Sequence, residues 1–151
     1  IDSGAFDRLI FLNRLYLNRN SIKIIDSFLF LKITKLDKLD LSQNDIENLK
    51  AFNFFNINTN SIDLRMNQLK EILNNTFMNL FNLMFLRFGY NRINTISTYF
   101  LNFVNDPEKI RLYFQGLELN NNNLSSLEFL SNRYLKFLIK IMAKDKYFIY
   151  I

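Results

Sequence analysis

The sequence predicts an α/β solenoid, in which short parallel strands stack into a concave sheet and short helical or irregular turns form the convex side. Two observations support this prediction. The first is the pattern L-D-K-L-D-L-S-Q-N-D-I at 36–46, whose spacing recurs in stretches that start at 12, 59, 83 and 114. The second is the step between starts, which is 36 − 12 = 24, 59 − 36 = 23, 83 − 59 = 24 and 114 − 83 = 31 residues. Repetition at such a period indicates a stacked-repeat architecture.

Each repeat contains one short strand. Its L-x-L segment alternates apolar and polar residues, as a strand with one buried face does. The apolar side chains are expected to point inward and the polar ones outward. The central apolar residues of successive repeats should therefore align as rungs beneath one parallel sheet. These residues are Leu15, Leu39, Ile62, Leu86 and Leu117.

Asparagine and phenylalanine mark the rest of each repeat. An asparagine follows each strand, at positions 20, 44, 67, 91 and 122. These amides are predicted to point inward and to satisfy backbone groups of adjacent turns, because an unpaired buried amide is costly. Phe6, Phe30 and Phe77 recur in the second halves of the repeats and are expected to point into the interior.

The repeats predict one domain that covers 1–151. Residues 1–11 are interpreted as the second half of an incomplete repeat, because Phe6 and Leu9 precede the first full motif with the spacing of the other repeats. The chain has no initiating methionine and no polar cap at either end, and solenoids need such caps. We therefore expect it to be a fragment of a longer protein.

Two segments depart from the regular repeat. A further step of 24 from position 114 reaches Leu138, and 138–151 are interpreted as a degenerate sixth repeat or cap. The alternative is an amphipathic helix, because basic residues recur three or four apart at Arg133, Lys136, Lys140 and Lys144. The fourth repeat is 31 − 24 = 7 residues longer than the others, with the excess in 97–113. Asp106-Pro107-Glu108 predicts a helix start there, in either a neutral convex insertion or a functional loop.

The five stretches share the motif L-x-x-L-x-L-x-x-N-x-L and resemble the leucine-rich repeat family. A 24-residue unit with an inward phenylalanine is similar to the typical subclass of Toll-like, Slit-like and small proteoglycan ectodomains. The resemblance implies a non-enzymatic protein-binding module, part of a receptor-like or extracellular ectodomain at the cell surface, that uses its concave face. The alternative is an intracellular leucine-rich repeat scaffold or adaptor in the cytoplasm.

The composition excludes several other functions. Histidine and cysteine are absent, so the usual general base, thiol nucleophile and zinc ligands are missing, and we expect no catalysis, no cofactor and no metal. The net charge of +5 comes from 19 basic residues scattered among 14 acids, so a nucleic-acid partner is not expected. No apolar run is long enough to span a bilayer.

The repeat register predicts three columns of side chains on the concave face. The first column, between the strand leucines, is Tyr16, Asp40, Asp63, Arg87 and Glu118. The second is Asn18, Ser42, Arg65, Gly89 and Asn120. The third is Arg19, Gln43, Met66, Tyr90 and Asn121.

From these columns we expect a protein ligand to contact Tyr16, Asn18, Arg19, Asp40, Gln43, Asp63, Arg65, Met66, Arg87, Tyr90 and Glu118. Tyrosine and arginine are the residues most enriched at binding hot spots. For any single residue, the alternative is an ordinary solvated position that pairs weakly with its neighbours. Association with copies of the chain or with other proteins through the solenoid faces is a further expectation.

Overall fold

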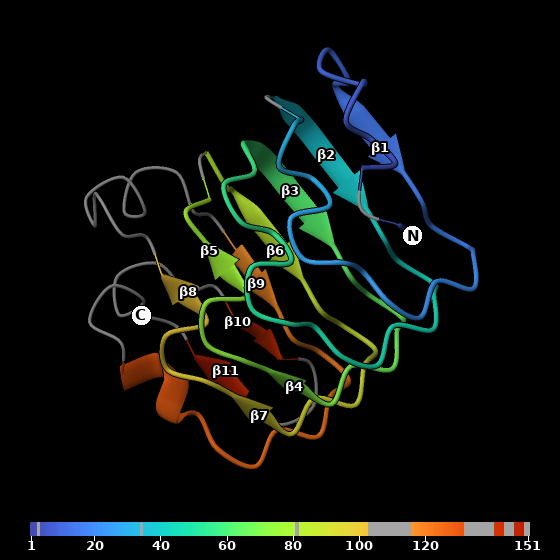
Figure 1. Ribbon diagram of the computed structural model, residues 1–151. Coiled ribbons are helices and arrows are strands. Elements are labelled where there is room, and N and C mark those ends of the chain that lie inside the picture. Colours follow the sequence, from blue (N-terminus) through green and yellow to red (C-terminus); the bar gives the residue numbers. More distant parts are fainter. Residues whose placement is uncertain are drawn as a thin grey trace.

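The computed structural model describes residues 1–2, 4–33, 35–80, 82–102, 116–131, 141–143 and 147–149. Strands from successive repeats lie side by side in it as the turns of one solenoid (Figure 1). Seven strands of the described residues form the main sheet, in the order β1-β2-β3-β6-β9-β10-β11. All neighbours are parallel except β11, which is antiparallel to β10. The bounds are β1 Arg14–Tyr16, β2 Leu36–Asp40, β3 Thr59–Asp63, β6 Phe85–Arg87, β9 Gly116–Glu118, β10 Ile141–Ala143 and β11 Tyr147–Ile149.

The predicted rungs are confirmed. Leu39 pairs with Leu15 on one side and with Ile62 on the other, and Leu86 pairs with Ile62 and Leu117 in the same register. Four of these five side chains are at most 1% exposed, and Leu15 is partly buried. The alternation of the L-x-L segment therefore turns one apolar residue per repeat into a continuous buried row.

The second halves of the repeats contain little helix. Among the described residues they form a 3-10 turn, η1 (Glu128–Ser131), and two small parallel sheets that pair β4 (Glu71–Ile72) with β7 (Thr95–Ile96) and β5 (Phe77–Met78) with β8 (Leu101–Asn102). Elsewhere the chain turns irregularly, and the turns are tied to one another by backbone hydrogen bonds. The Phe28 amide donates to the carbonyl of Phe52 at 3.3 Å, and the Phe52 amide donates to the carbonyl of Asn75 at 3.1 Å. The predicted parallel solenoid with irregular convex turns is thus confirmed.

A stack of phenylalanines fills the interior behind the sheet, as predicted. The ring centroids of Phe6 and Phe30 are 5.9 Å apart, those of Phe30 and Phe54 are 5.9 Å apart, and those of Phe54 and Phe77 are 4.9 Å apart, with nearly parallel planes. Phe30, Phe54 and Phe77 are at most 1% exposed. Such aromatic contacts contribute about 1 kcal/mol each beyond the burial of apolar area.

Four of the five predicted inward asparagines form a ladder between turns. In Asn91, Nδ2 donates to the carbonyl of Leu64 in the preceding turn at 2.9 Å, while Oδ1 accepts the amide of Leu69 at 3.1 Å. Asn44, Asn67 and Asn122 make the same contacts one turn before or after. Asn20 is the exception, because it is exposed and bonds only to carbonyls of its own turn. Its Nδ2 has the same partners within its own turn as that of Asn44, so the side chain has the predicted direction, and it stays exposed because no described turn covers it.

The ends of the predicted repeats are described only in part. Strand β10 pairs with β9, with Ile141 opposite Leu117 at a step of 141 − 117 = 24 residues. The whole basic stripe that supports the helical alternative at this end lies outside the described residues, as does the expected helix start at Asp106. The single-domain interpretation of 1–151 stays a prediction.

Candidate functional site

The three predicted columns stand in register across the main sheet. In the first column, Asp40 pairs with Tyr16 and Asp63, and Arg87 pairs with Asp63 and Glu118. Adjacent strands are about 4.8 Å apart, so each column is a row of neighbouring side chains. Backbone hydrogen bonds of 2.9–3.0 Å continue this register into the third column, where Arg19, Gln43, Met66 and Tyr90 donate to the following turn.

The site residues differ widely in accessibility. Tyr16 is 55% exposed, and Met66 and Tyr90 are 46% exposed. Arg19 is exposed, and Asn18, Gln43, Arg65, Arg87 and Glu118 are half-buried. Asp40 and Asp63, which share a column with Tyr16, are only 8% and 1% exposed. The concave face therefore presents aromatic, thioether and guanidinium groups, while the two aspartates lie beneath them.

Asp63 is held by Arg65. Arg65 donates from Nη2 to Asp63 Oδ2 at 2.6 Å and from Nε to both carboxylate oxygens at 3.0 and 3.1 Å, and its backbone amide donates to Oδ1 at 3.1 Å. Burial of a carboxylate is costly unless an opposite charge and hydrogen bonds compensate for the lost water. The same hydrogen bonds raise the pKa of Arg65. Asp63 therefore fixes the direction of the Arg65 side chain.

Asp40 is held by Ser42 and Lys38. The Ser42 hydroxyl and amide donate to Oδ1 at 2.7 and 3.1 Å, and Lys38 Nζ lies 3.2 Å from Oδ2. Burial alone raises the pKa of Asp40, but the hydrogen bonds from Ser42 and the charge of Lys38 outweigh it, and the pKa lies below its ordinary value. Both oxygens of this carboxylate are thus occupied by neighbours on its own strand and turn.

Arg87 and Glu118 extend the charged row across β6 and β9. Arg87 donates from Nη1 to Ser61 Oγ at 2.9 Å, and its guanidinium lies 5.0 Å from the ring centre of Phe85. Glu118 lies between two arginines, 3.7 Å from Arg87 Nε and 3.9 Å from Arg65 Nη1. Pairs as exposed as these contribute about 0–1 kcal/mol each, so the arrangement leaves the guanidinium groups available to a partner.

The third column has an unusual backbone. Arg19, Gln43, Met66, Tyr90 and Asn121 all adopt left-handed conformations, with φ between 54° and 58°. This conformation costs roughly 1 kcal/mol for a residue other than glycine or asparagine. Four of these five positions nevertheless carry long side chains, those of Arg19, Gln43, Met66 and Tyr90, at this edge of the sheet. Arg19 Nε donates to Gln43 Oε1 at 2.7 Å, and Gln43 Nε2 donates to Met66 Sδ at 3.3 Å.

One concave column was missed by the sequence reasoning. The residues two positions before the first column also face outward, because side chains alternate along a strand. They are Arg14, Lys38, Ser61, Phe85 and Gly116, in register across β1, β2, β3, β6 and β9. The alternation on either side of the rung residue was the signal that could have identified them.

Gly89 has a steric role in the second column. A Cβ atom at this position would lie 2.4 Å from Asn120 Oδ1 and 2.9 Å from Glu118 Oε1. The absence of a side chain at Gly89 therefore leaves room for the side chains of Glu118 and Asn120 to pack against its backbone. Asn120 is 9% exposed, and its Oδ1 has no hydrogen-bond donor among the described residues.

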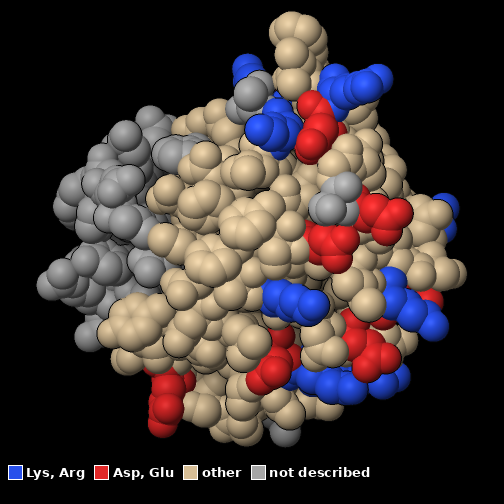
Figure 2. Space-filling model, in the orientation of Figure 1, with Lys and Arg blue, Asp and Glu red and all other residues tan. Residues whose placement is uncertain are grey.

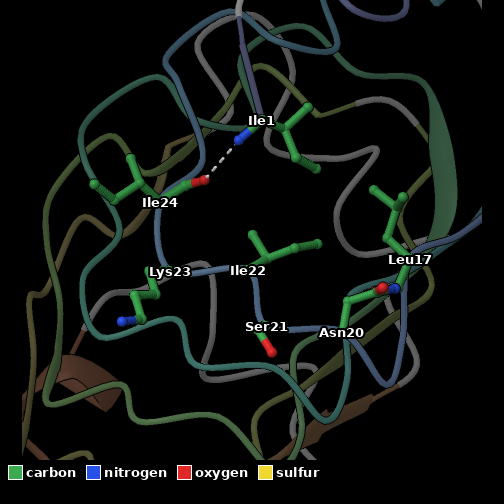
Figure 3. Close-up of a pocket in the computed structure, with 7 residues that line it drawn as sticks. All are labelled: Ile1, Leu17, Asn20, Ser21, Ile22, Lys23 and Ile24. Atoms are coloured by element: carbon green, nitrogen blue, oxygen red, sulfur yellow. Dashed lines mark hydrogen bonds between the residues drawn. The ribbon is translucent and has the colours of Figure 1, made fainter.

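A shallow cavity of about 580 Å³ lies at the N-terminal end of the solenoid. Figure 3 shows the side chains of Ile1 and Ile22 pointing into it, whereas those of Ser21 and Lys23 point away. The N-terminal amine donates to the carbonyl of Ile24 at 3.4 Å across its rim. The lining is mainly apolar.

Two further kinds of site are not found in the part of the chain that the structure describes. No group of three or more acidic, histidine or cysteine side chains there could hold a metal ion. No helix there has the length and apolar character needed to cross a membrane. Figure 2 shows acidic and basic side chains interspersed on the face in view, without a large area of one sign.

Comparison with known proteins agrees with the geometry. No curated protein matches this sequence significantly. The sequence profile of the family described as "Leucine rich repeat" matches residues 1–46, and no catalytic family is identified. Domains of this kind are typically protein-binding modules and are usually non-catalytic. Residues 1–46 are therefore leucine-rich repeat sequence, within a parallel β-solenoid whose turns recur about every 24 residues.

Proposed function

We propose that this chain is a protein-binding module of a receptor-like or extracellular ectodomain, and that the partner contacts its concave face. The observation that carries the proposal is the exposure of Tyr16, Met66 and Tyr90 on the same face as the oriented guanidinium groups of Arg65 and Arg87. Aromatic side chains and arginine dominate the energy of protein interfaces. A stacked sheet also presents them over a continuous surface, as extended binding surfaces of solenoids do.

The balance of charge supports a protein partner. Each acid of the first column has a cation within 4 Å, so the central part of the face is close to neutral. A surface of this kind suits the mixed polar and apolar contacts of a protein interface better than the phosphate backbone of a nucleic acid, which requires many unpaired cations.

The experiment is an affinity capture from extracellular and cell-surface proteins, followed by quantitative binding to the captured partner. Tyr90→Ala and Arg87→Gln should each weaken binding about tenfold or more, because central aromatic and arginine residues contribute about 2 kcal/mol each. Tyr99→Ala is the matched control, since Tyr99 is 59% exposed and lies in the second half of a repeat. Equal affinity of the wild type and both concave variants would reject the concave face.

The extracellular location is proposed on the 24-residue unit, the inward phenylalanines and two exposed glycosylation acceptors, Asn74 and Asn123, in N-x-S/T sequences. The absence of cysteine favours the cytoplasmic scaffold as the second candidate. Secretion of the chain from eukaryotic cells separates the two. The proposal expects a folded, secreted product whose mass falls after glycosidase treatment, and which loses that change in the double variant Asn74→Gln/Asn123→Gln. Retention and degradation in the secretory pathway, with a folded product from the cytoplasm, would favour the scaffold.

A further inference from the structure

The first two turns of the concave face carry two cations directly opposite each other. Arg14 in β1 is in register with Lys38 in β2. Like charges in this position destabilise a sheet, since opposite side chains are about 5 Å apart at Cβ. Lys38 is paired with Asp40, with its Nζ 3.2 Å from Asp40 Oδ2, and it also lies 5.2 Å from the ring centre of Tyr16. Arg14 is exposed and forms no ion pair with any described residue.

A third cation lies on the other side of Tyr16. Arg19 is exposed and held in the left-handed conformation, and its Nε donates to the neutral side chain of Gln43 at 2.7 Å. No described carboxylate lies within ion-pair distance of Arg19. Tyr16, which is 55% exposed, is therefore flanked along its own turn by two arginines without acidic partners.

The charge of these two turns differs from that of the later ones. Arg14, Arg19 and Lys38 face the single carboxylate of Asp40, which gives 3 − 1 = +2 on the concave columns. Asp37, which follows Leu36 in β2, lies outside these columns; its side chain is half-buried and forms no ion pair among the described residues.

In the later turns, Arg65 and Arg87 balance Asp63 and Glu118, which gives 2 − 2 = 0. The concave face is thus basic at its N-terminal end and neutral beyond it.

We propose that the N-terminal end of the concave face binds an acidic segment of a protein partner. Carboxylates of the segment pair with Arg14 and Arg19, and an apolar or aromatic side chain packs on Tyr16. This inference rests on the proposed function and specifies the chemistry of the partner. Arg14 and Arg19 have no carboxylate partner among the described residues, and guanidinium groups bind carboxylates in bidentate geometry.

The size of the basic area favours a short peptide segment over a nucleic acid. Arg14 and Tyr16 are two residues apart on one strand, a distance of about 7 Å, and β2 lies about 4.8 Å away. Two or three carboxylates fill such an area. A nucleic acid extends further and gains affinity from many phosphate contacts, which the neutral turns beyond β2 do not provide.

The test uses the full chain and a fluorescein-labelled peptide that alternates glutamate with tyrosine. A peptide with glutamine in place of glutamate and a single-stranded oligonucleotide of equal charge are the comparison probes. We expect the acidic peptide to bind at least about tenfold more tightly than the glutamine peptide, and this preference to fall as salt rises from about 50 to about 500 mM. Equal binding of the two peptides, or tighter binding of the oligonucleotide, would overturn the proposal.

Matched variants locate the binding. The double variant Arg14→Gln/Arg19→Gln should lose about tenfold in affinity for the acidic peptide, and Arg14→Lys/Arg19→Lys should retain most of it because the charge is kept. The control Arg92→Gln/Lys50→Gln removes the same two charges from exposed positions outside the concave columns. An equal loss in test and control variants would show general charge attraction and reject the site.

The proposed function and this inference fail in different ways. A captured partner that depends on Tyr90 and Arg87, but not on Arg14, Arg19 or salt, would keep the concave face as the binding surface and reject the acidic segment. Peptide binding that depends on Arg14 and Arg19, without any loss in Tyr90→Ala, would support the acidic site and limit the binding surface to the first two turns. All of these residues are exposed or half-buried, so thermal melts of the variants should stay close to that of the wild type.

Discussion

Asn67 Oδ1 accepts the backbone amide of Ile46 at 3.0 Å, across the boundary between two turns of the solenoid. The same side chain donates from Nδ2 to the carbonyls of Leu41 and Leu64 at 3.0 and 3.1 Å. One side-chain amide thus bonds to backbone groups of two adjacent turns. The stacking of the turns depends on this contact as much as on the apolar rungs.

Asn67→Ala should therefore destabilise the fold strongly. The change leaves the buried amide of Ile46 without a partner, whereas the carbonyls of Leu41 and Leu64 still accept from Asn44 and Asn91. One unsatisfied buried group costs about 1–3 kcal/mol, so a loss of about 2 kcal/mol is expected. Asn20→Ala is the matched control, because Asn20 is exposed and bonds only within its own turn. Urea unfolding monitored by circular dichroism measures both. Similar losses in the two variants would contradict the ladder.

Phe54→Ala should remove the centre of the phenylalanine stack. Phe54 is fully buried between Phe30 and Phe77, and truncation of a buried phenylalanine typically costs about 3–5 kcal/mol through lost burial and the cavity that remains. Phe11→Ala, at a side chain that is 93% exposed, should change stability by less than about 0.5 kcal/mol. The free energy of unfolding in denaturant distinguishes the two, and a small effect at Phe54 would mean that the stack is not a structural core.

Ser42→Ala should reduce stability in a pH-dependent way. The Ser42 hydroxyl donates to Asp40 at 2.7 Å and helps to hold the pKa of that carboxyl below its unfolded value. A carboxyl with a lowered folded pKa stabilises the fold above its unfolded pKa of about 4 and loses this contribution as the pH falls further.

The variant is therefore expected to be about 1 kcal/mol less stable than the wild type at pH 7, and this difference should shrink as the pH falls through the lowered folded pKa of Asp40. Thermal melts across this range measure the difference. Ser21→Ala, at an exposed serine, should show no such dependence. A difference between Ser42→Ala and wild type that is constant with pH would contradict the role of Asp40.

Met66→Asn should stabilise the chain. Met66 adopts a φ of 54°, a conformation that asparagine tolerates much better than methionine, and relief of this strain is worth roughly 0.5–1 kcal/mol. The reverse change, Asn121→Met at a φ of 55°, should cost a similar amount. Denaturant unfolding of both variants tests the prediction, and shifts of the same sign would contradict it. Because Met66 is 46% exposed on the concave face, Met66→Asn should lower the affinity for a partner bound there, even though it raises the stability of the chain.

The sequence by itself determined the architecture. The rungs, the asparagine ladder and the stacked phenylalanines are set by residue spacing, because each repeat places the same side chain at the same point of the turn. Leu39, Asn67 and Phe30 all lie where their positions in the repeat predict. The same register assigned which residues belong to each concave column.

Only the tertiary structure decided which members of a column face a partner. Asp63 and Arg87 hold equivalent strand positions, yet one is 1% exposed and the other's side chain is 30% exposed. The difference arises because the side chain of Arg65, two residues after Asp63, covers the Asp63 carboxylate and bonds to it. Arg87 instead contacts Ser61 and Glu118 on the two neighbouring strands. Spacing fixes where a side chain starts, but its accessibility depends on the hydrogen bonds and charges that adjacent turns bring to it.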